Sequence, residues 1–303
     1  MPDDLHGKAI STAFINWFFF DHLGRPESWQ DAAPFGALAG HPLREKLALN
    51  GLAHHMIGLA GGDLKPLSLD REILSPSKHM LTRAINPFGM ESKVAGDADM
   101  LAFDVRFLFV DDAPQPSIQW LSCVDKSRLT VDAAGKLAKL SADDMATLET
   151  LASLTALRLR SVLKGVGVRL AAGKLSFETP MGRQFILADT IGPDELDLQM
   201  DGLRLSQDFL CNSYRASSWL AAVEKAKILA AEREEADWKR ICTEELKAHP
   251  PLLSPITKEK AVMIYKTLAR ALCEKNHGKT IFADAWDMPR LASALMPKQK
   301  AVA

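Results

Sequence analysis

The chain has 303 residues, of which 47% are hydrophobic and 25% charged, the composition of an ordinary globular protein. This composition excludes a disordered, collagen-like or coiled-coil architecture for the bulk of the chain. The 37 basic and 38 acidic side chains give a net charge of −1, so no global field directs the protein toward nucleic acid or an anionic membrane. We therefore expect one large domain or two small ones, with neither nucleic acid nor a membrane as partner.

The four cysteines are far apart in the sequence, at Cys123, Cys211, Cys242 and Cys273. Their spacing excludes a disulfide framework and a zinc ribbon, and it favours buried or idle thiols in a reducing compartment. The N-terminus carries acids where a signal peptide needs bases. The most apolar stretch, residues 14–20, is far shorter than the roughly 20 residues of a membrane span, so it predicts a buried strand or a core helix. We expect a cytoplasmic protein.

The first half of the chain predicts one helix and several strands. Glycines and prolines after the aromatic run predict a loop before residue 40. Apolar residues at helical spacing predict a helix over 43–60, ended by a pair of glycines. Strands are expected at 78–85, 99–110 and 117–124, and in the second of these the apolar residues share one parity.

The second half alternates between helical and extended patterns. Ser141, followed by two acids, predicts the start of a helix that runs to about Leu163. Three short strands follow, at 166–171, 174–178 and 183–189. Residues 206–247 are expected to be largely helical, and a last helix begins at Thr257 and ends at Gly278. This mixed order favours an α+β fold over a doubly wound parallel sheet.

One short segment carries most of the candidate chemistry. Alternate residues of a strand share a face, so Lys174, Ser176 and Glu178 are expected to project together, while Asp189 ends the next strand of the hairpin. An ammonium group and two carboxylates at one end of a sheet suit a magnesium-bound phosphate, because oxygen atoms ligate the metal and the cation faces the phosphoryl oxygens. The alternative is a set of solvated charges beside a hairpin turn.

Common catalytic and nucleotide-binding motifs are absent from the sequence, including the P-loop, G-x-G-x-x-G, H-E-x-x-H and G-x-S-x-G. His54 and His55 are adjacent, and neighbours on a helix point about 100° apart, so they are expected to be core or surface histidines rather than a metal pair. The glycine pair at 61–62 indicates a helix stop rather than a phosphate-binding loop.

Beyond these patterns, the sequence resembles the SAICAR synthetase family, the phosphoribosylaminoimidazole-succinocarboxamide synthases of purine biosynthesis. The resemblance rests on the segments 165–177, 186–194, 205–210 and 250–279. It is clearest over residues 145–282, faint over 40–110 and nearly absent before residue 40.

The resemblance implies an α+β, two-domain fold, with a small β-containing N-terminal domain, a larger α/β C-terminal domain and a nucleotide cleft between them. Residues 1–85 would form the reduced, lid-like N-terminal domain, and 86–303 the main domain with the C-terminal helices. The implied activity is that of an ADP-forming carbon–nitrogen ligase that uses ATP and Mg²⁺. It would join aspartate or another amine to a carboxylated aminoimidazole ribotide, or a related carboxylate, through an acyl phosphate. The resemblance leaves a homo-oligomer open.

For the nucleotide and the metal, the resemblance points to four residues. Asp189 would hold Mg²⁺, and Lys174 would lie against the substrate or the transferred phosphoryl group. The family's metal-binding glutamate corresponds to Ser176, so Glu178, two residues on and on the same strand face, would supply the second metal ligand. Lys8 is the lysine kept from the family's G-K-x-K segment, which covers the nucleotide.

For catalysis and substrate binding, the resemblance again names particular residues. Lys174 and Asp194 would be catalytic, and Asp194 would contact the substrate or orient the aspartate amine. Arg83 would meet the substrate's anionic groups. Arg215 would do the same in place of the family's arginine, where this chain has Cys211.

Departures from the family pattern leave two alternatives open. One is a catalytically inactive paralogue that acts as a binding or regulatory subunit, which Ser176, Asp197 and Cys211 favour. The other is a ligase of specialised metabolism with a changed substrate, since phosphate-binding arginines are lost while Lys174 and Asp189 are kept.

Overall fold

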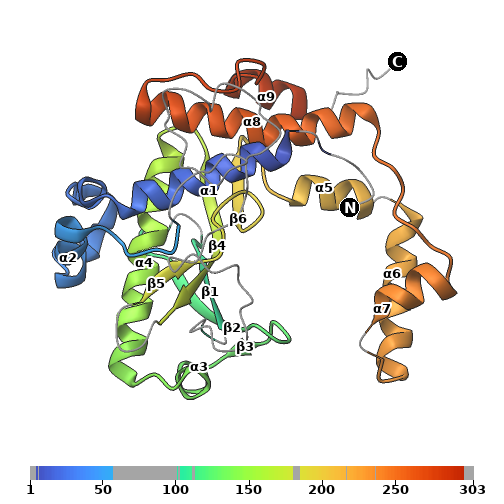
Figure 1. Cartoon of the computed structure of the whole chain (residues 1–303), viewed down its shortest axis with the longest axis horizontal. Helices are drawn as coiled ribbons and strands as arrows, with labels where there is room; N and C mark the ends of the chain where they lie inside the picture. Colours follow the sequence, from blue (N-terminus) through green and yellow to red (C-terminus); the bar gives the residue numbers. More distant parts are fainter. Residues whose placement is uncertain are drawn as a thin grey trace, which may run out of the picture.

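The structure is a computed structural model, and it describes residues 5, 7–56, 101, 103–110, 113–179, 185–215, 217–235 and 237–296. An antiparallel sheet lies at its centre, with strand order β3-β2-β1-β4-β6-β7 and with β5 paired to β4 (Figure 1). The strands are β1 (Phe103–Leu108), β2 (Ser117–Ser122), β3 (Arg128–Leu129), β4 (Arg169–Glu178), β5 (Ile186–Ala188), β6 (Leu196–Met200) and β7 (Leu203–Arg204). Every pairing between these strands is antiparallel, which confirms the α+β fold class.

Helices cover the sheet and extend beyond it. The α-helices are α1 (Lys8–Gly24), α2 (Pro42–Asn50), α3 (Val131–Ala138), α4 (Ala142–Lys164), α5 (Asp208–Arg215), α6 (Ser218–Glu232), α7 (Trp238–Arg240), α8 (Pro255–His277) and α9 (Met288–Leu295). Shorter helical segments are η1 (Pro26–Trp29), η2 (Ala33–Leu38) and the π-helical η3 (Ile241–Glu245). Within the described residues, no helix is long and apolar enough to cross a membrane.

The N-terminal aromatic run forms a core helix. Phe14, Phe18, Phe19 and Phe20 all lie buried in α1, which packs along α8 and shares the hydrophobic core of the sheet (Figure 1). The sequence predicted either a buried strand or a core helix for this run, and the structure shows the core helix. The predicted loop after it consists of η1 and η2. Residues 7–50 are helical apart from their connections. The expected domain boundary near residue 85 lies outside the described residues, as do Arg83 and the expected strand at 78–85.

The predicted helix over 43–60 is wrong in its extent, because α2 ends at Asn50. Gly51 has a φ of 71°, and a Cβ atom there would lie 1.8 Å from the Gly24 carbonyl oxygen. Only glycine fits this contact, so the chain must turn at that point. The following residues are extended instead, and His54 forms a parallel bridge with Leu187 beside β5.

The two longest helices begin and end close to where the sequence predicts. Ser141 caps α4 by accepting from the Asp144 backbone N–H, and the Asp144 side chain accepts from the Ser141 backbone N–H. This reciprocal capping box satisfies donors that a helix start leaves unpaired. Helix α8 ends at His277, and Gly278 follows in the left-handed conformation with a φ of 65°.

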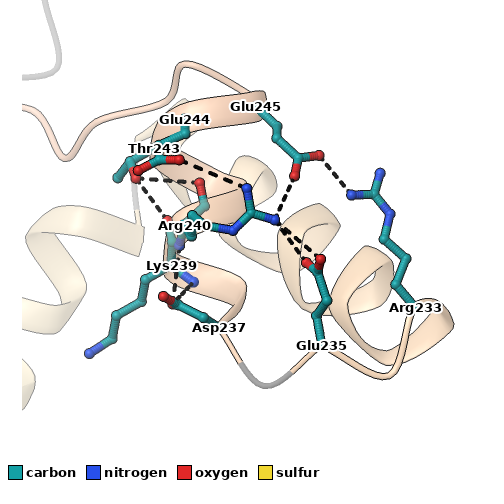
Figure 2. Close-up of polar contacts among 8 residues, drawn as sticks. All are labelled: Arg233, Glu235, Asp237, Lys239, Arg240, Thr243, Glu244 and Glu245. Atoms are coloured by element: carbon teal, nitrogen blue, oxygen red, sulfur yellow. Dashed lines mark hydrogen bonds and ion pairs between the residues drawn. The ribbon is translucent and has the colours of Figure 1, made fainter.

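Helices α6 and α7 and segment η3 form an arm that projects from the body (Figure 1). Its apolar side chains form a separate cluster of Val223, Ala226, Ala230, Ile241 and Cys242. On the arm's surface, Arg240 forms ion pairs with Glu235, Glu244 and Glu245, and Glu245 also pairs with Arg233 (Figure 2). The arm thus has its own small core and its own network of charges.

Candidate active site

The Lys174 ammonium and the Asp189 carboxylate form an ion pair with an Nζ–Oδ2 distance of 3.1 Å. Ser176 pairs with Ala188 across β4 and β5, so Ala188 faces the same side of the sheet as Lys174. An extended Asp189 would point to the opposite side. Its φ is 62°, and this left-handed conformation breaks the alternation at the end of β5 and brings the carboxylate to Lys174.

Asp104 on β1 is a buried carboxylate at the same position in the sheet. The register pairs Arg106 with Lys174, which places Asp104 opposite Ser176. Asp104 accepts a hydrogen bond from Ser176 Oγ at 2.8 Å, and the Nζ atoms of Lys126 and Lys174 lie 3.2 and 3.8 Å from its Oδ2. Lys174 therefore lies between two carboxylates, one buried and one half-exposed.

The electrostatic surroundings of Lys174 keep it protonated. Burial alone would lower the pKa of Lys174, but the hydrogen bond and charge of Asp189, together with the charges of Asp104 and Glu195, outweigh it and raise the pKa. The side chain stays about one-third exposed. A permanent cation that solvent can still reach is suited to bind an incoming anion.

A second ion pair joins the first helix to the loop before β6. Lys8 Nζ lies 2.7 Å from Asp194 Oδ2, and the Tyr265 hydroxyl of α8 donates a hydrogen bond to Asp194 Oδ1. The Lys8 ammonium also lies over the Tyr265 ring, 4.4 Å from its centroid. Burial, with the nearby charge of Asp194, raises the pKa of Tyr265. Asp194 is thus held between a cation and a neutral hydroxyl.

Glu195 lies between the two ion pairs. The Glu195 backbone carbonyl accepts a hydrogen bond from the backbone N–H of Lys174 at 3.1 Å. The Glu195 carboxylate accepts one from the Thr190 hydroxyl at 2.8 Å. Burial raises the pKa of Glu195, the Thr190 hydrogen bond opposes that shift, and the charges of Asp194 and Asp189 add to it. These interactions connect the ion pairs into one polar region at the end of the sheet.

Glu178 faces His55 rather than Lys174. His55 Nδ1 lies 3.6 Å from Glu178 Oε1, and the Nε2 of the same ring bonds the Asp189 backbone carbonyl at 3.0 Å. A carbonyl only accepts, so Nε2 carries the proton. Among the described residues, no group of three or more His, Cys, Asp or Glu side chains is arranged to hold a metal ion. The pairing of Glu178 with Asp189 as metal ligands stays a prediction.

Of the two predicted substrate arginines, the structure describes Arg215 and not Arg83. Arg215, in the last turn of α5, donates to Asn212 of the same helix at 2.9 Å. Its described hydrogen bond therefore does not connect it to the ion pairs at the end of the sheet. The place of Arg83 falls within the segment that the structure does not describe.

The residues present fit a magnesium–nucleotide group. Magnesium usually takes one or two protein carboxylates and completes its shell with phosphate oxygens and water. The Asp189 side chain is 42% exposed and could serve as such a ligand. The ammonium groups of Lys8 and Lys174 are suited to phosphate oxygens.

Sequence reasoning missed three contributors to this region, namely Asp104, Glu195 and His55. Asp104 alternates with the apolar residues of its strand, and it is buried because β1 lies next to β4, a contact between distant segments. Glu195 directly follows the predicted site residue Asp194, and this adjacency in the sequence could have indicated that Glu195 belongs to the same region. Of the two histidines that the sequence left as core or surface residues, His55 is buried and His54 is partly exposed, and each packs on the Phe20 ring at a centroid distance of 5.4 Å.

No family model and no curated protein matches this sequence. Solved structures do match. The phosphoribosylaminoimidazole-succinocarboxamide synthase of Ehrlichia chaffeensis is 15% identical, with a TM-score of 0.44, over 81% of this chain and 84% of that one. SAICAR synthetase of Pyrococcus horikoshii is 16% identical, with a TM-score of 0.43, over 82% and 86%. SAICAR synthase of Saccharomyces cerevisiae, in complex with SAICAR, is 12% identical, with a TM-score of 0.47, over 92% and 84%. These similarities concern the fold alone.

Proposed function

We propose that this chain is an ATP-dependent ligase that joins an amine, such as that of aspartate, to a carboxylated aminoimidazole ribotide or a related carboxylate. The observation that carries the proposal is the Lys174–Asp189 ion pair, with the Lys8–Asp194 pair in the same polar region. Four residues that the sequence resemblance assigns to the reaction thus lie together, although they come from α1, β4 and two loops.

The chemistry explains why cations and acids are needed together. A carboxylate is a poor electrophile until one of its oxygens becomes part of a leaving group. Its oxygen attacks the γ-phosphorus of ATP, ADP leaves, and an acyl phosphate forms. The neutral amine nitrogen then attacks the acyl carbon, inorganic phosphate leaves with the bonding electrons, and the proton lost by the nitrogen goes to the released phosphate. When bound, magnesium would supply positive charge to the triphosphate.

Each residue would have a distinct role in that sequence. Lys174, which stays protonated, would stabilise negative charge on the transferred phosphoryl group. Lys8 would bind the nucleotide, and Asp189 would hold the magnesium ion. Asp194, fixed by Lys8 and Tyr265, would accept a hydrogen bond from the attacking amine and so orient its lone pair.

The test is ADP release by the full chain with ATP, Mg²⁺, the carboxylated ribotide and aspartate. We expect turnover, and we expect Lys174→Met to lower it by about 10²-fold, the usual effect of removing one electrostatic contact to the transition state. Lys225→Met, at an exposed position on the arm, is the matched control. Absence of turnover, together with no protection by ATP and Mg²⁺ in a thermal melt, would overturn the proposal.

A second candidate function is a binding or regulatory subunit without catalysis. The observation that favours it is that both predicted phosphate-binding cations are already paired with acids of the chain, Lys8 with Asp194 and Lys174 with Asp189. Co-purification with an active synthetase would support this alternative, whereas turnover by the chain alone would exclude it. A ligase with a changed substrate would release ADP only with other carboxylates.

A further inference from the structure

A polar cavity lies where the end of α1 meets α4 and the end of α8. Its volume is about 320 Å³, and it is lined by Phe18, His22, Arg25, Arg158 and His277 among others. Its lining residues include no member of the Lys8–Asp194 or Lys174–Asp189 ion pairs. His22 also lies fourteen positions along α1 from Lys8, about 21 Å at 1.5 Å per residue. The cavity is therefore distinct from both ion pairs.

Arg158 of α4 is one of the residues that line this cavity. It is half-buried, and burial lowers its pKa, with the charge of Asp31 opposing that shift. Its Nε donates a hydrogen bond to His22 Nε2 at 3.0 Å. Within the part of the chain that the structure describes, no carboxylate forms an ion pair with it. A guanidinium keeps its charge in proteins, so this is a partly desolvated cation whose charge only the more distant Asp31 opposes.

The surroundings of His22 hold Arg158 in one orientation. Burial lowers the pKa of His22 to about 3, and the charges of Arg158, Arg25 and His277 lower it further. At neutral pH the ring is therefore uncharged, and its Nε2 lone pair accepts from Arg158. The ring stacks on Phe18 with a centroid distance of 5.9 Å, which fixes its plane. With Nε occupied, the two Nη groups of Arg158 remain for a ligand.

The other charges around the cavity largely balance one another. Arg25 forms an ion pair with Asp21 at 2.5 Å, so neither leaves a net charge. Glu27 is exposed, and its charge is screened by water. His277 stacks on Trp17, and burial lowers its pKa. Among the charged residues that line the cavity, Arg158 is thus the cation without an ion pair in the described part of the chain, with Asp31 opposing its charge from outside the lining.

We propose that this cavity binds the oxyanion group of a small molecule, a phosphate or a carboxylate, with Arg158 as its anchor. The planar guanidinium offers parallel N–H groups whose spacing matches two oxygens of either anion. Binding would compensate a charge that the fold leaves unpaired, so the anion gains more there than at an exposed arginine. His22 is a positioning residue, because it acts on the anion through Arg158.

The experiment titrates the full chain with inorganic phosphate and, separately, with succinate at constant ionic strength. Binding is followed by calorimetry and by the NMR signals of the His22 ring. We expect saturable binding, weakened at least tenfold in Arg158→Gln and unchanged in Arg128→Gln, a control on the exposed strand β3. Tighter binding of phosphate would identify the ligand as a phosphate ester, and tighter binding of succinate as a carboxylate.

Two further variants keep the test decisive. Arg158→Lys keeps the charge but loses the paired N–H groups, so it should also weaken binding if Arg158→Gln fails to fold. His22→Phe keeps a ring on Phe18 but removes the acceptor, and it should weaken binding while Arg158 remains. The proposal would be overturned by the lack of saturable binding of either anion, or by equal affinity in wild type and folded Arg158 variants.

Discussion

Lys174 reaches Asp189 because Asp189 has a left-handed backbone at the end of β5. The φ of 62° directs the carboxylate to the face of the sheet that carries Lys174, and the two groups meet at 3.1 Å. Asparagine and aspartate adopt this conformation more readily than other non-glycine residues. The relationship therefore depends both on the charge of residue 189 and on its tolerance of a positive φ.

Replacing Asp189 with asparagine separates these two requirements. Asp189→Asn should fold as wild type does, because the backbone conformation is kept, but it should lower ADP release by about 10²-fold because a metal-binding and Lys174-pairing charge is lost. Asp201→Asn is the matched control, since Asp201 also has a positive φ, of 49°, in the exposed turn between β6 and β7. Equal activity of the two variants would contradict the role given to Asp189.

Asp104 should matter more for stability than an exposed acid. Asp104→Asn removes a buried charge that accepts from Ser176 and faces two lysines, so we expect a loss of about 1–3 kcal/mol in the free energy of unfolding. Urea denaturation followed by circular dichroism measures it, with Asp132→Asn in the first turn of α3 as the control. A loss no larger than that of the control would show that the contacts of Asp104 with Ser176, Lys126 and Lys174 contribute little to the free energy of unfolding.

The ends of the longest helices could be predicted because their signals are local. Ser141 with Asp144, and Gly278 with its positive φ, fix the ends of α4 and α8 within a few residues of sequence. The end of α2 could not be predicted, since the apolar spacing continues past Gly51. What stops the helix is the closeness of Gly51 to the carbonyl of Gly24, a contact that a periodicity does not contain.

In the candidate site, too, contacts between residues close in the sequence were predictable, and contacts between distant segments were not. The Lys174–Asp189 pair was predictable, because one hairpin connects the two residues. The burial of Asp104 was not, because it requires β1 to pair with β4 across more than sixty residues of chain. The hydrogen bond from Tyr265 to Asp194 likewise depends on how α8 packs against the loop before β6.

The capping box of α4 gives a direct test of a local signal. Ser141→Ala removes the acceptor for the Asp144 N–H, and we expect it to cost about 1 kcal/mol in the free energy of unfolding. Ser141→Thr keeps a hydroxyl at the cap and should stay close to wild type. Chemical denaturation of the three proteins measures the difference, and equal stabilities would show that the cap is not required.

Gly173 should not tolerate a side chain. A Cβ atom there would lie 2.4 Å from Phe107 Cζ and 2.6 Å from Leu196 Cδ2, on the strands that flank β4. Gly173→Ala should therefore destabilise the sheet by about 1–3 kcal/mol, the usual cost of overpacking. Gly202→Ser, in the open turn before β7, has no such contact, but it carries a backbone cost because its φ is 77°. If Gly173→Ala lowers the free energy of unfolding less than Gly202→Ser does, the packing around β4 is looser than these distances imply.

His22 should make the fold sensitive to mild acid. Its pKa falls from 6.5 in the unfolded chain to about 3 in the folded one, chiefly through burial. A lowered pKa means that the unfolded state binds the proton more readily. The stabilising contribution is therefore complete above pH 6.5 and is lost as the pH falls toward 3. Between pH 7 and pH 5, His22 alone should remove about 2 kcal/mol from the free energy of unfolding.

The His22→Phe variant isolates this effect from the other titrating groups. It cannot take up the proton, so its stability should fall by about 2 kcal/mol less than that of wild type between pH 7 and pH 5. His249→Phe, at an exposed position that does not line the Arg158 cavity, controls for the loss of one histidine. Urea denaturation at the two pH values measures the difference. Parallel losses in wild type and His22→Phe would mean that His22 is protonated in the folded state near pH 6, and hence that it does not accept the hydrogen bond from Arg158.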